Sequence, residues 1–314
     1  MSTDGPRADH VVAEVAGRAG WINALSIDVE DWYHDQSRRD GAARPEEVAS
    51  VAPRVERNLE VLLGLLAEHG ARATLFFLAD VAERHPQLVR AALAAGHEIG
   101  SHGLEHRPVG RRSHAELSVD FASARDRIEN VAGVAVRGFR APCFISDPKD
   151  LWALDVVAEC GFAYDSSYMP LRYHPGDVHR LAPRGEPVRL PSGLWEFPLP
   201  LSRVPTGHVL PCAAGGFALR ALPFAVTRHY LRRFNEEVGP AVVYTHPWEI
   251  DPDSPKLPGT PRYVRVFNRI GRGRMKRQLR RLLGEFRFAP LAEVYADLLA
   301  SSNGDGARAT RAPH

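Results

Sequence analysis

Two histidines, His102 and His106, lie four residues apart in the sequence SHGLEH. Imidazole rings at positions i and i+4 of a helical turn face the same side, which suits two ligands of one divalent metal ion. A histidine that caps a loop–helix junction would show the same spacing, so the pair alone does not decide between a metal site and a structural role. The hypothesis of a metal site depends on acidic residues elsewhere in the chain.

Three carboxylates, Asp28, Glu30 and Asp31, directly follow an apolar segment that ends at Ile27. An exposed acidic turn is one interpretation. If the preceding segment is a buried strand, so much negative charge needs a counter-charge such as a metal ion or an arginine. Hydrolysis at a metal ion uses one carboxylate to hold the ion and a second, unbound one to remove a proton from water. This cluster could supply both.

Two further residues could complete such a site. Arg140, in the sequence GFRAPC, could orient the unbound carboxylate and keep it ionised, although an arginine at a strand end is more often a simple ion-pair partner. His246 follows the β-branched sequence VVYT, where an imidazole could protonate a leaving group; a buried structural histidine is the alternative. Neither residue is diagnostic by itself.

The segments between these residues alternate between strand-like and helix-like patterns. Strands are predicted at residues 21–27, 73–78, 97–101, 136–139, 162–166 and 242–245, and helices at residues 51–69, 86–95, 113–131 and 148–160. Ser113, with Glu116 three residues later, forms a capping-box signature for the third helix. Repeated strand–helix units predict a parallel sheet covered by helices, closed or nearly closed into a barrel.

In barrels of this type the reactive groups lie at the carboxyl ends of the strands. Five residues, each just past or at the end of a predicted strand, are therefore expected to converge on one face: Asp28, His102, Arg140, Asp165 and His246. The stretch at residues 168–227 is rich in Pro and Gly and breaks the alternation. We interpret it as an elaborated insertion over the site.

Composition narrows the class of protein. The 314 residues are 44% hydrophobic and 25% charged, as in ordinary globular proteins, and the net charge of +2 gives no reason to expect a nucleic-acid partner. The three cysteines, Cys143, Cys160 and Cys212, are too widely spaced for a disulfide framework or a zinc knuckle. No segment has the apolar length of a signal peptide or a membrane span, so a cytoplasmic location is expected.

The remaining segments have plainer interpretations. Residues 1–20 and 301–314 lack periodicity and are expected to be disordered tails around one catalytic domain at residues 21–300. The basic run RGRMKRQLRR at residues 272–281 fits the solvated face of a helix, and a patch for phosphate or a polyanion is the alternative.

Taken together, these motifs resemble the polysaccharide deacetylase family, carbohydrate esterase family 4, over residues 22–299. Within that family the chain is most similar to the branch found at exosortase (PEP-CTERM) loci and linked to exopolysaccharide processing. The sequences that carry the resemblance are SIDVEDWY at residues 26–33, GFRAP at 138–142, YDSS at 164–167, EFP at 196–198, HPWEIDP at 246–252 and FRFAPL at 286–291.

The resemblance implies a distorted (β/α)7-type barrel and metal-dependent hydrolysis of an N-acetyl group on an amino-sugar saccharide. It places the general base at Asp28, the metal-binding pair at His102 and His106, the residue that tethers the base at Arg140, and the general acid at His246. Trp248 and Glu249, beside the acid, could tune its pKa.

Two positions depart from the family pattern. Val29 replaces the second of two adjacent aspartates, which makes Glu30 the expected third metal ligand and Asp31 the fallback. Cys143 replaces the usual aromatic residue after the Arg-x-Pro sequence, a tolerable change if the role of that position is a backbone N–H to the oxyanion.

Two histidines and one carboxylate suit Zn²⁺, with Co²⁺, Ni²⁺ or Mn²⁺ as alternatives. Trp32, Tyr33 and Trp195 are candidate platforms for stacking on a sugar, although core packing explains them equally well. Two other functions stay open: an allantoinase-like hydrolase of a cyclic amide or imide, and a catalytically silent metal-binding barrel. The identity of the saccharide, an N- or O-linked acetyl group and the oligomeric state are not fixed by the sequence.

Overall fold

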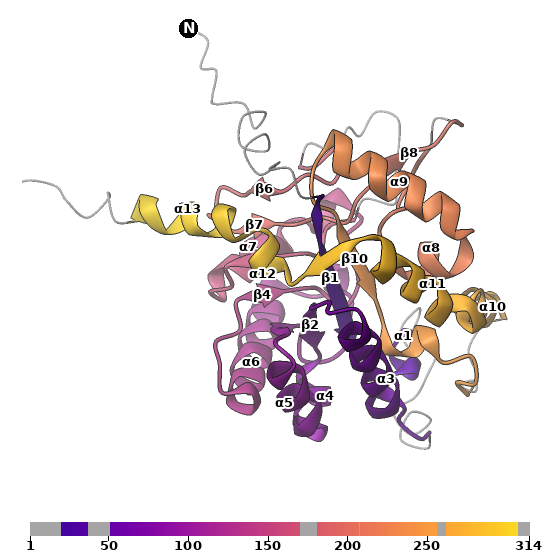
Figure 1. Cartoon of the computed structure of the whole chain (residues 1–314). Coiled ribbons are helices and arrows are strands. Elements are labelled where there is room, and N and C mark those ends of the chain that lie inside the picture. The colour runs from indigo at the N-terminus through magenta and orange to yellow at the C-terminus, as the bar shows by residue number, and fades with distance from the viewer. Residues whose placement is uncertain (1–19, 37–50, 170–180, 207, 256–261, 307–314) are drawn as a thin grey trace, which may run out of the picture.

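The computed structural model describes residues 20–36, 51–169, 181–206, 208–255 and 262–306 (Figure 1). Almost all of the expected N-terminal tail, residues 1–19, lies outside the described residues, as do residues 307–314. The expected C-terminal tail begins differently, because helix α13 (Ala296–Gly306) continues past residue 301.

One sheet organises the chain. Its strands follow the order β10-β1-β2-β3-β4-β5-β7-β6, and β11 also pairs with β1. All neighbours are parallel except β6 and β7. The strands are β1 (Ile22–Val29), β2 (Thr74–Phe77), β3 (Glu98–Ser101), β4 (Gly138–Phe139), β5 (Tyr164–Asp165), β6 (Val188–Arg189), β7 (Trp195–Glu196), β10 (Val242–Thr245) and β11 (Arg287–Ala289). The predicted parallel sheet is confirmed, and it curls into an open half-barrel: among the described strands, no pairing joins β6 to β10.

Both faces of this sheet are buried, as parallel sheets require. On β2, Leu75 and Phe77 point into the core beneath the helices, while Phe76, between them, points into the interior of the curl with Tyr164. Glycines make room for these rings. A Cβ atom at Gly100 would lie 2.5 Å from the Phe76 ring, and one at Gly138 would lie 2.2 Å from the Tyr164 ring.

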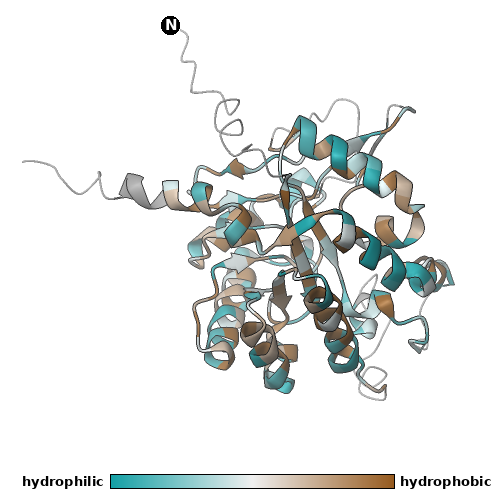
Figure 2. Cartoon of the chain, viewed as in Figure 1, coloured by the Kyte–Doolittle hydropathy of each residue, from teal (hydrophilic) through white to brown (hydrophobic). Residues whose placement is uncertain are grey.

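Helices cover the convex face of the half-barrel. They are α3 (Val55–Glu68), α4 (Ala79–Arg84), α5 (Pro86–Ala94), α6 (His114–Ala132) and α7 (Ala153–Glu159) (Figure 1). Figure 2 shows hydrophobic residues concentrated on the strands and on the helix sides that face them. The predicted capping box starts α6, where Ser113 accepts a hydrogen bond from the Glu116 backbone N–H. The predicted helix at residues 148–160 is divided into η3 (Pro148–Asp150) and α7, and α4 was missed because its six residues are too few for a periodic pattern.

A second group of elements comes from the C-terminal half. It consists of α8 (Gly216–Ala221), α9 (Phe224–Glu237), η4 (Pro247–Ile250), α10 (Arg262–Arg269), α11 (Arg272–Glu285) and α12 (Leu291–Val294). The hairpin of β8 (Ser202–Arg203) and β9 (Val209–Leu210) precedes them, and the short α1 (Trp32–Gln36) and η2 (Val109–Arg111) complete the elements. Within the predicted insertion, β7 joins the main sheet beside β5. Of the helices that the structure describes, none combines the length and apolar character that a bilayer span requires.

Candidate active site

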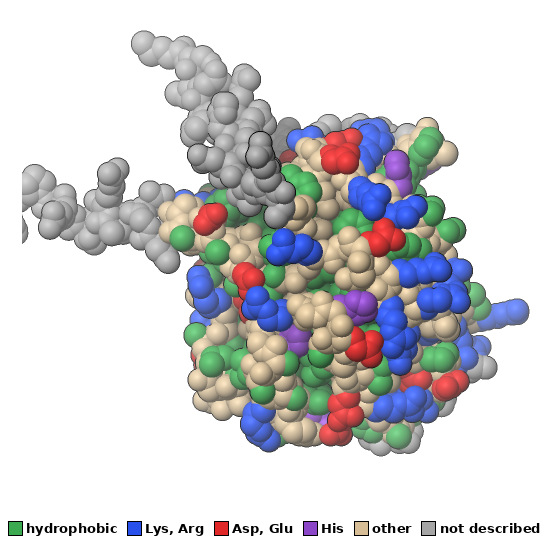
Figure 3. Space-filling view, in the orientation of Figure 1, with side chains coloured by type: hydrophobic (Ala, Val, Ile, Leu, Met, Phe, Trp, Pro, Cys, Tyr) green, Lys and Arg blue, Asp and Glu red, His purple; other side chains and the backbone are tan. Residues whose placement is uncertain are grey.

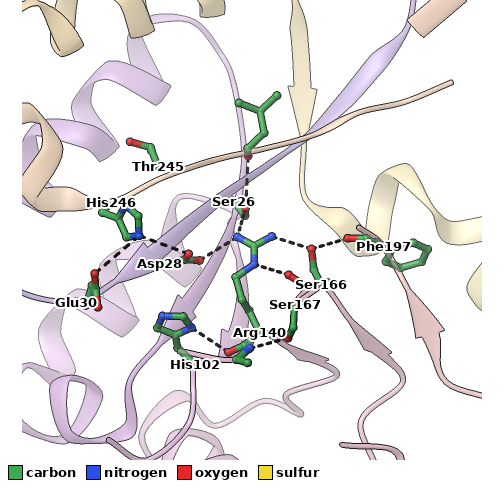
Figure 4. Close-up of polar contacts among 12 residues, drawn as sticks. Ser26, Asp28, Glu30, His102, Arg140, Ser166, Ser167, Phe197, Thr245 and His246 are labelled. Atoms are coloured by element: carbon green, nitrogen blue, oxygen red, sulfur yellow. Dashed lines mark hydrogen bonds and ion pairs between the residues drawn. The ribbon is translucent and has the colours of Figure 1, made fainter. Parts of the chain in front are cut away.

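The carboxyl ends of four parallel strands bring four of the predicted residues together (Figure 4). Asp28 lies at the end of β1, His102 directly follows β3, Arg140 directly follows β4, and His246 directly follows β10. Because the strands run in the same direction, their carboxyl ends form one edge of the sheet. Asp165, the fifth predicted residue, ends β5 but bonds to Ser167 within the layer that supports Arg140.

Arg140 holds Asp28 in a buried ion pair. Its Nη1 lies 2.9 Å from Asp28 Oδ1 and also donates to Ser26 Oγ at 2.6 Å, and the guanidinium is fully buried. Its other side donates to Ser166, from Nε to the carbonyl oxygen at 2.8 Å and from Nη2 to the hydroxyl at 2.7 Å. A buried guanidinium with this many acceptors fixes the orientation of the carboxylate, and Asp28 Oδ2 is left facing His246.

Glu30, His102 and His106 form a buried cluster whose ligand atoms all lie within 4.8 Å of one another. The carboxylate Oε2 of Glu30 lies 2.5 Å from His106 Nε2. The Nδ1 atom of His102 lies 2.9 Å from the carbonyl oxygen of Arg140, so Nδ1 carries the proton and Nε2 presents a lone pair. That Nε2 is buried and has no hydrogen-bond partner among the described residues.

Burial lowers the pKa of His102, which keeps its ring neutral as a metal ligand must be. Two neutral imidazoles and one carboxylate are the donor set of many catalytic zinc sites, with positions left over for water and substrate. The orphaned Nε2 of His102 and the close approach of Glu30 to His106 therefore fit a divalent cation.

Asp31, the fallback ligand, has a different position. Its Oδ1 accepts the Trp32 backbone N–H at 2.8 Å, and its Oδ2 accepts the backbone N–H groups of Arg54 at 2.8 Å and Val55 at 3.2 Å. These contacts satisfy free amides at the starts of α1 and α3. Asp31 thus joins two helix starts and is not part of the Glu30–His102–His106 cluster.

His246 stands at the edge of the site, its side chain 16% exposed against 2% for Asp28 and 1% for Glu30. Its Nε2 lies 3.8 Å from both Asp28 Oδ2 and Glu30 Oε1, and its Nδ1 lies 3.3 Å from Glu249 Oε2. Burial opposes protonation, but the hydrogen bond and charge of Glu249, with the charges of Glu30 and Asp28, outweigh it and raise the pKa of His246 to about 9. The ring can therefore hold a proton beside the site at neutral pH.

Glu249 is itself held by an arginine that sequence reasoning missed. Arg220, on α8, donates from Nε to Glu249 Oε1 at 2.8 Å, and both side chains are 1% exposed. Burial opposes ionisation of Glu249, but His246 and Arg220 overcome it and lower the pKa of Glu249 to about 2. No periodic pattern pointed to Arg220, which lies 29 residues before Glu249 in the Pro- and Gly-rich stretch.

Trp248 contacts both His246 and the Glu30–His102–His106 cluster. Its Nε1 donates to Glu30 Oε1 at 2.9 Å, and its ring stacks on His246 with centroids 4.9 Å apart. The guanidinium of Arg272 lies 4.7 Å from the Trp248 ring centroid. Trp248 thus orients the carboxylate of Glu30 and packs against His246 at the same time.

A buried pair of acids, Asp165 and Glu196, supports the floor of the site. Asp165 accepts hydrogen bonds from the backbone N–H and the hydroxyl of Ser167, each at 2.7 Å. Burial, followed by the charge of Asp165, raises the pKa of Glu196 well above its usual range. Together they order the segment that carries Ser166, the partner of Arg140.

The remaining predicted residues lie around this centre. Trp32 is fully buried against Tyr33 and Trp248, and a ring with no exposed face cannot stack on a saccharide; the structure places Trp32 and Tyr33 in the core. Trp195 is half-buried beside Phe197, and its role as a platform stays a prediction. Cys143 is half-buried after β4, and the use of its backbone N–H is likewise untested.

Two parts of the chain match models of known protein families. Residues 51–164 match the family model for polysaccharide deacetylases. This part of the chain is similar to polysaccharide deacetylases. Residues 166–296 match a second model, described only as a domain of unknown function, DUF3473. A chitooligosaccharide deacetylase of Azorhizobium caulinodans is 35% identical over 79 residues, which are 25% of this chain and 38% of that protein. The chain spans less than half the length of the curated chitooligosaccharide deacetylases that it matches.

Solved structures share the fold. A protein of Mycobacterium smegmatis assigned to the polysaccharide deacetylases has a TM-score of 0.60 at 20% identity, over 91% of this chain and 93% of that one. Puue allantoinase has a TM-score of 0.53 at 16% identity, over 93% of this chain and 96% of that one. The fold of this chain thus also occurs in an allantoinase, so function must be argued from the site.

Proposed function

We propose that this chain is a metal-dependent hydrolase that removes N-acetyl groups from an amino-sugar saccharide, of the kind processed in exopolysaccharide biosynthesis. The observation that carries the proposal is the Glu30–His102–His106 cluster beside Asp28, a carboxylate that Arg140 keeps out of the cluster. Several curated relatives support the class of substrate, because they are chitooligosaccharide and peptidoglycan N-acetylglucosamine deacetylases. The motif resemblance supports the link to exopolysaccharides.

Glu30, His102 and His106 would hold the cation, and Zn²⁺ suits two imidazoles and a carboxylate, with Co²⁺, Ni²⁺ and Mn²⁺ as alternatives. When bound, a divalent cation acidifies water and polarises the amide carbonyl, which is why amide hydrolysis at neutral pH uses one. The proton held on Nδ1 of His102 fixes which nitrogen is available to the ion.

The other residues move protons. Asp28 accepts the proton of the attacking water on Oδ2, the oxygen that faces the site, while Arg140 holds Oδ1. His246, protonated with the support of Glu249, donates a proton to the departing amine nitrogen. The backbone N–H of Cys143 stabilises the oxyanion of the tetrahedral intermediate.

Acetate release from N-acetylglucosamine oligomers tests this function. We expect release by the metal-loaded protein, loss of release after treatment with a chelator, and recovery when Zn²⁺ or Co²⁺ is added. Asp28→Asn should lower kcat/KM by about two to four orders of magnitude, the usual effect of losing a general base. Asp253→Asn, which changes an exposed carboxylate just after η4, is the matched control and should leave the rate unchanged.

Ring opening of allantoin, measured with the same preparations, separates the reaction from that of a cyclic-amide hydrolase. Ring opening without acetate release would contradict the proposal. Acetate release that survives both the chelator and Asp28→Asn would contradict the assigned roles.

A further inference from the structure

Helix α10 and the residue that follows it expose an apolar stripe, which the rest of the described chain covers only in part. Tyr263, Val266, Phe267 and Ile270 are 61%, 54%, 38% and 39% exposed and follow the i, i+3, i+4, i+7 spacing of one helical face. They are four of only seven large hydrophobic side chains that are exposed among the described residues. Isolated exposed apolar residues are common, but a continuous stripe on one helix indicates a binding surface.

The stripe is surrounded by positive charge. Residues 262–284, which span α10 and most of α11, contain nine Lys and Arg and no Asp or Glu, in a chain whose net charge is only +2. In the part of the chain that the structure describes, Arg280 pairs with Glu68, whereas Arg262, Arg265, Lys276 and Arg277 have no carboxylate partner. Figure 3 shows Lys and Arg gathered along the right edge of the molecule, where Figure 1 places α10 and α11.

We propose that this surface, α10 together with the exposed side of α11, binds the surface of an anionic lipid bilayer. An apolar stripe edged by unpaired arginines and lysines is the pattern of helices that lie in a membrane interface, where the stripe enters the acyl boundary and the cations meet lipid phosphates. A second copy of this chain fits poorly, because a two-fold contact would bring two clusters of positive charge together. A nucleic acid would account for the arginines but not for Val266 and Ile270.

The surface lies next to the candidate active site. Arg220 donates to the backbone carbonyls of Phe267 and Ile270 on one side and to Glu249 on the other. Phe267 stacks on Phe217 of α8 with ring centroids 4.2 Å apart. Bilayer contact through α10 would therefore hold the strand ends that carry His246 close to the membrane surface. The proposal does not depend on the deacetylase activity.

Flotation with vesicles tests it on the full chain. We expect binding to vesicles of phosphatidylcholine and phosphatidylglycerol in a two-to-one ratio, weakened by added salt, and little binding to phosphatidylcholine alone. The double variant Val266→Ser/Ile270→Ser and the double variant Lys276→Gln/Arg277→Gln should each reduce the partition coefficient about tenfold or more. Circular dichroism and thermal unfolding establish that both variants are folded.

Matched changes elsewhere provide the controls. Val119→Ser removes a valine that is 70% exposed on α6, and Arg90→Gln/Arg111→Gln removes two exposed arginines far along the chain from α10. Neither should alter vesicle binding. Absence of binding to anionic vesicles overturns the proposal. Vesicle binding that is unchanged in Val266→Ser/Ile270→Ser also overturns it. Tighter binding to a DNA duplex than to vesicles overturns it as well. Either result would mean that the surface is a general site for polyanions.

Discussion

Asp28 and Glu30 are two positions apart at the end of β1, so both side chains point to the same side of the sheet while Val29, between them, points into the core. This alternation explains how an Asp-Val-Glu sequence places two carboxylates at one site. Their partners then separate their roles. Arg140 holds Asp28, whereas Trp248 and His106 hold Glu30.

Asp31 offers a prediction about a structural carboxylate. Asp31→Ala removes the acceptor of three backbone N–H groups at the starts of α1 and α3 and should lower the free energy of unfolding by about 1–2 kcal/mol. Urea unfolding measures this loss, and metal analysis of the same variant should still find one cation per chain. Loss of the cation in Asp31→Ala, with retention in Glu30→Gln, would reverse the two assignments.

Glu249 offers a prediction about pH. In the proposed mechanism His246 donates a proton, so activity should require its protonated form and fall as pH rises through its pKa, which Glu249, Glu30 and Asp28 raise to about 9 against the opposing effect of burial. A cation bound at Glu30 would offset one of those negative charges and so lower the pKa of His246 in the metal-loaded enzyme. Glu249→Gln removes the largest of the raising influences, and the alkaline limb of the kcat profile should move to lower pH. The profile of Asp253→Asn should not move, and an unmoved limb in Glu249→Gln would exclude His246 as the acid.

At the scale of elements, the close packing inside the curled sheet depends on two glycines. Gly138→Ala would press a methyl group into the Tyr164 ring and should destabilise the protein by about 1–3 kcal/mol. Gly64→Ala, in the middle of α3 with nothing within 4 Å of its Cβ position, should instead stabilise it by roughly 0.5–1 kcal/mol. Thermal unfolding of both variants checks the contrast, and equal effects would contradict this account of the interior.

Strand ends explain how much of the site the sequence could predict. Asp28, His102, Arg140 and His246 each follow an apolar strand, and parallel strands bring such positions to one edge whatever the intervening loops do. Arg220 and Arg272 carry no such signal. They reach the site through α8 and α11, whose positions depend on tertiary packing between segments that are far apart in sequence. The same limit applies to Trp32, because a sequence does not distinguish a buried tryptophan from one that lines a groove.

At the scale of the whole molecule, the site is assembled from three parts of the chain. His102, His106 and Arg140 lie within the polysaccharide deacetylase match, His246 lies within the DUF3473 match, and β1, with Asp28 and Glu30, precedes both. β1 pairs with β2, β10 and β11, and this pairing joins the parts into one sheet. The proposed chemistry therefore requires both matched regions together.

Cation binding should consequently stabilise the entire fold. A ligand that binds only the folded state at a hundred times its Kd adds about 2.7 kcal/mol, which corresponds to a rise in Tm of roughly 5 °C or more for a chain of this size. A chelator should lower the Tm of the purified protein by that amount, as measured by scanning calorimetry. Glu30→Gln should show no response to the chelator, and an equal response in this variant would place the cation elsewhere.

The central claim is that Glu30, His102 and His106 hold one divalent cation while Asp28 stays free of it. Anomalous diffraction from crystals grown with Zn²⁺ or Co²⁺, recorded on both sides of the metal absorption edge, tests this most directly. The account predicts a single strong peak in coordination contact with Glu30, His102 Nε2 and His106, with Asp28 still paired to Arg140. A peak coordinated by Asp28 or Asp31 in place of Glu30, or no peak among the three side chains, would contradict it.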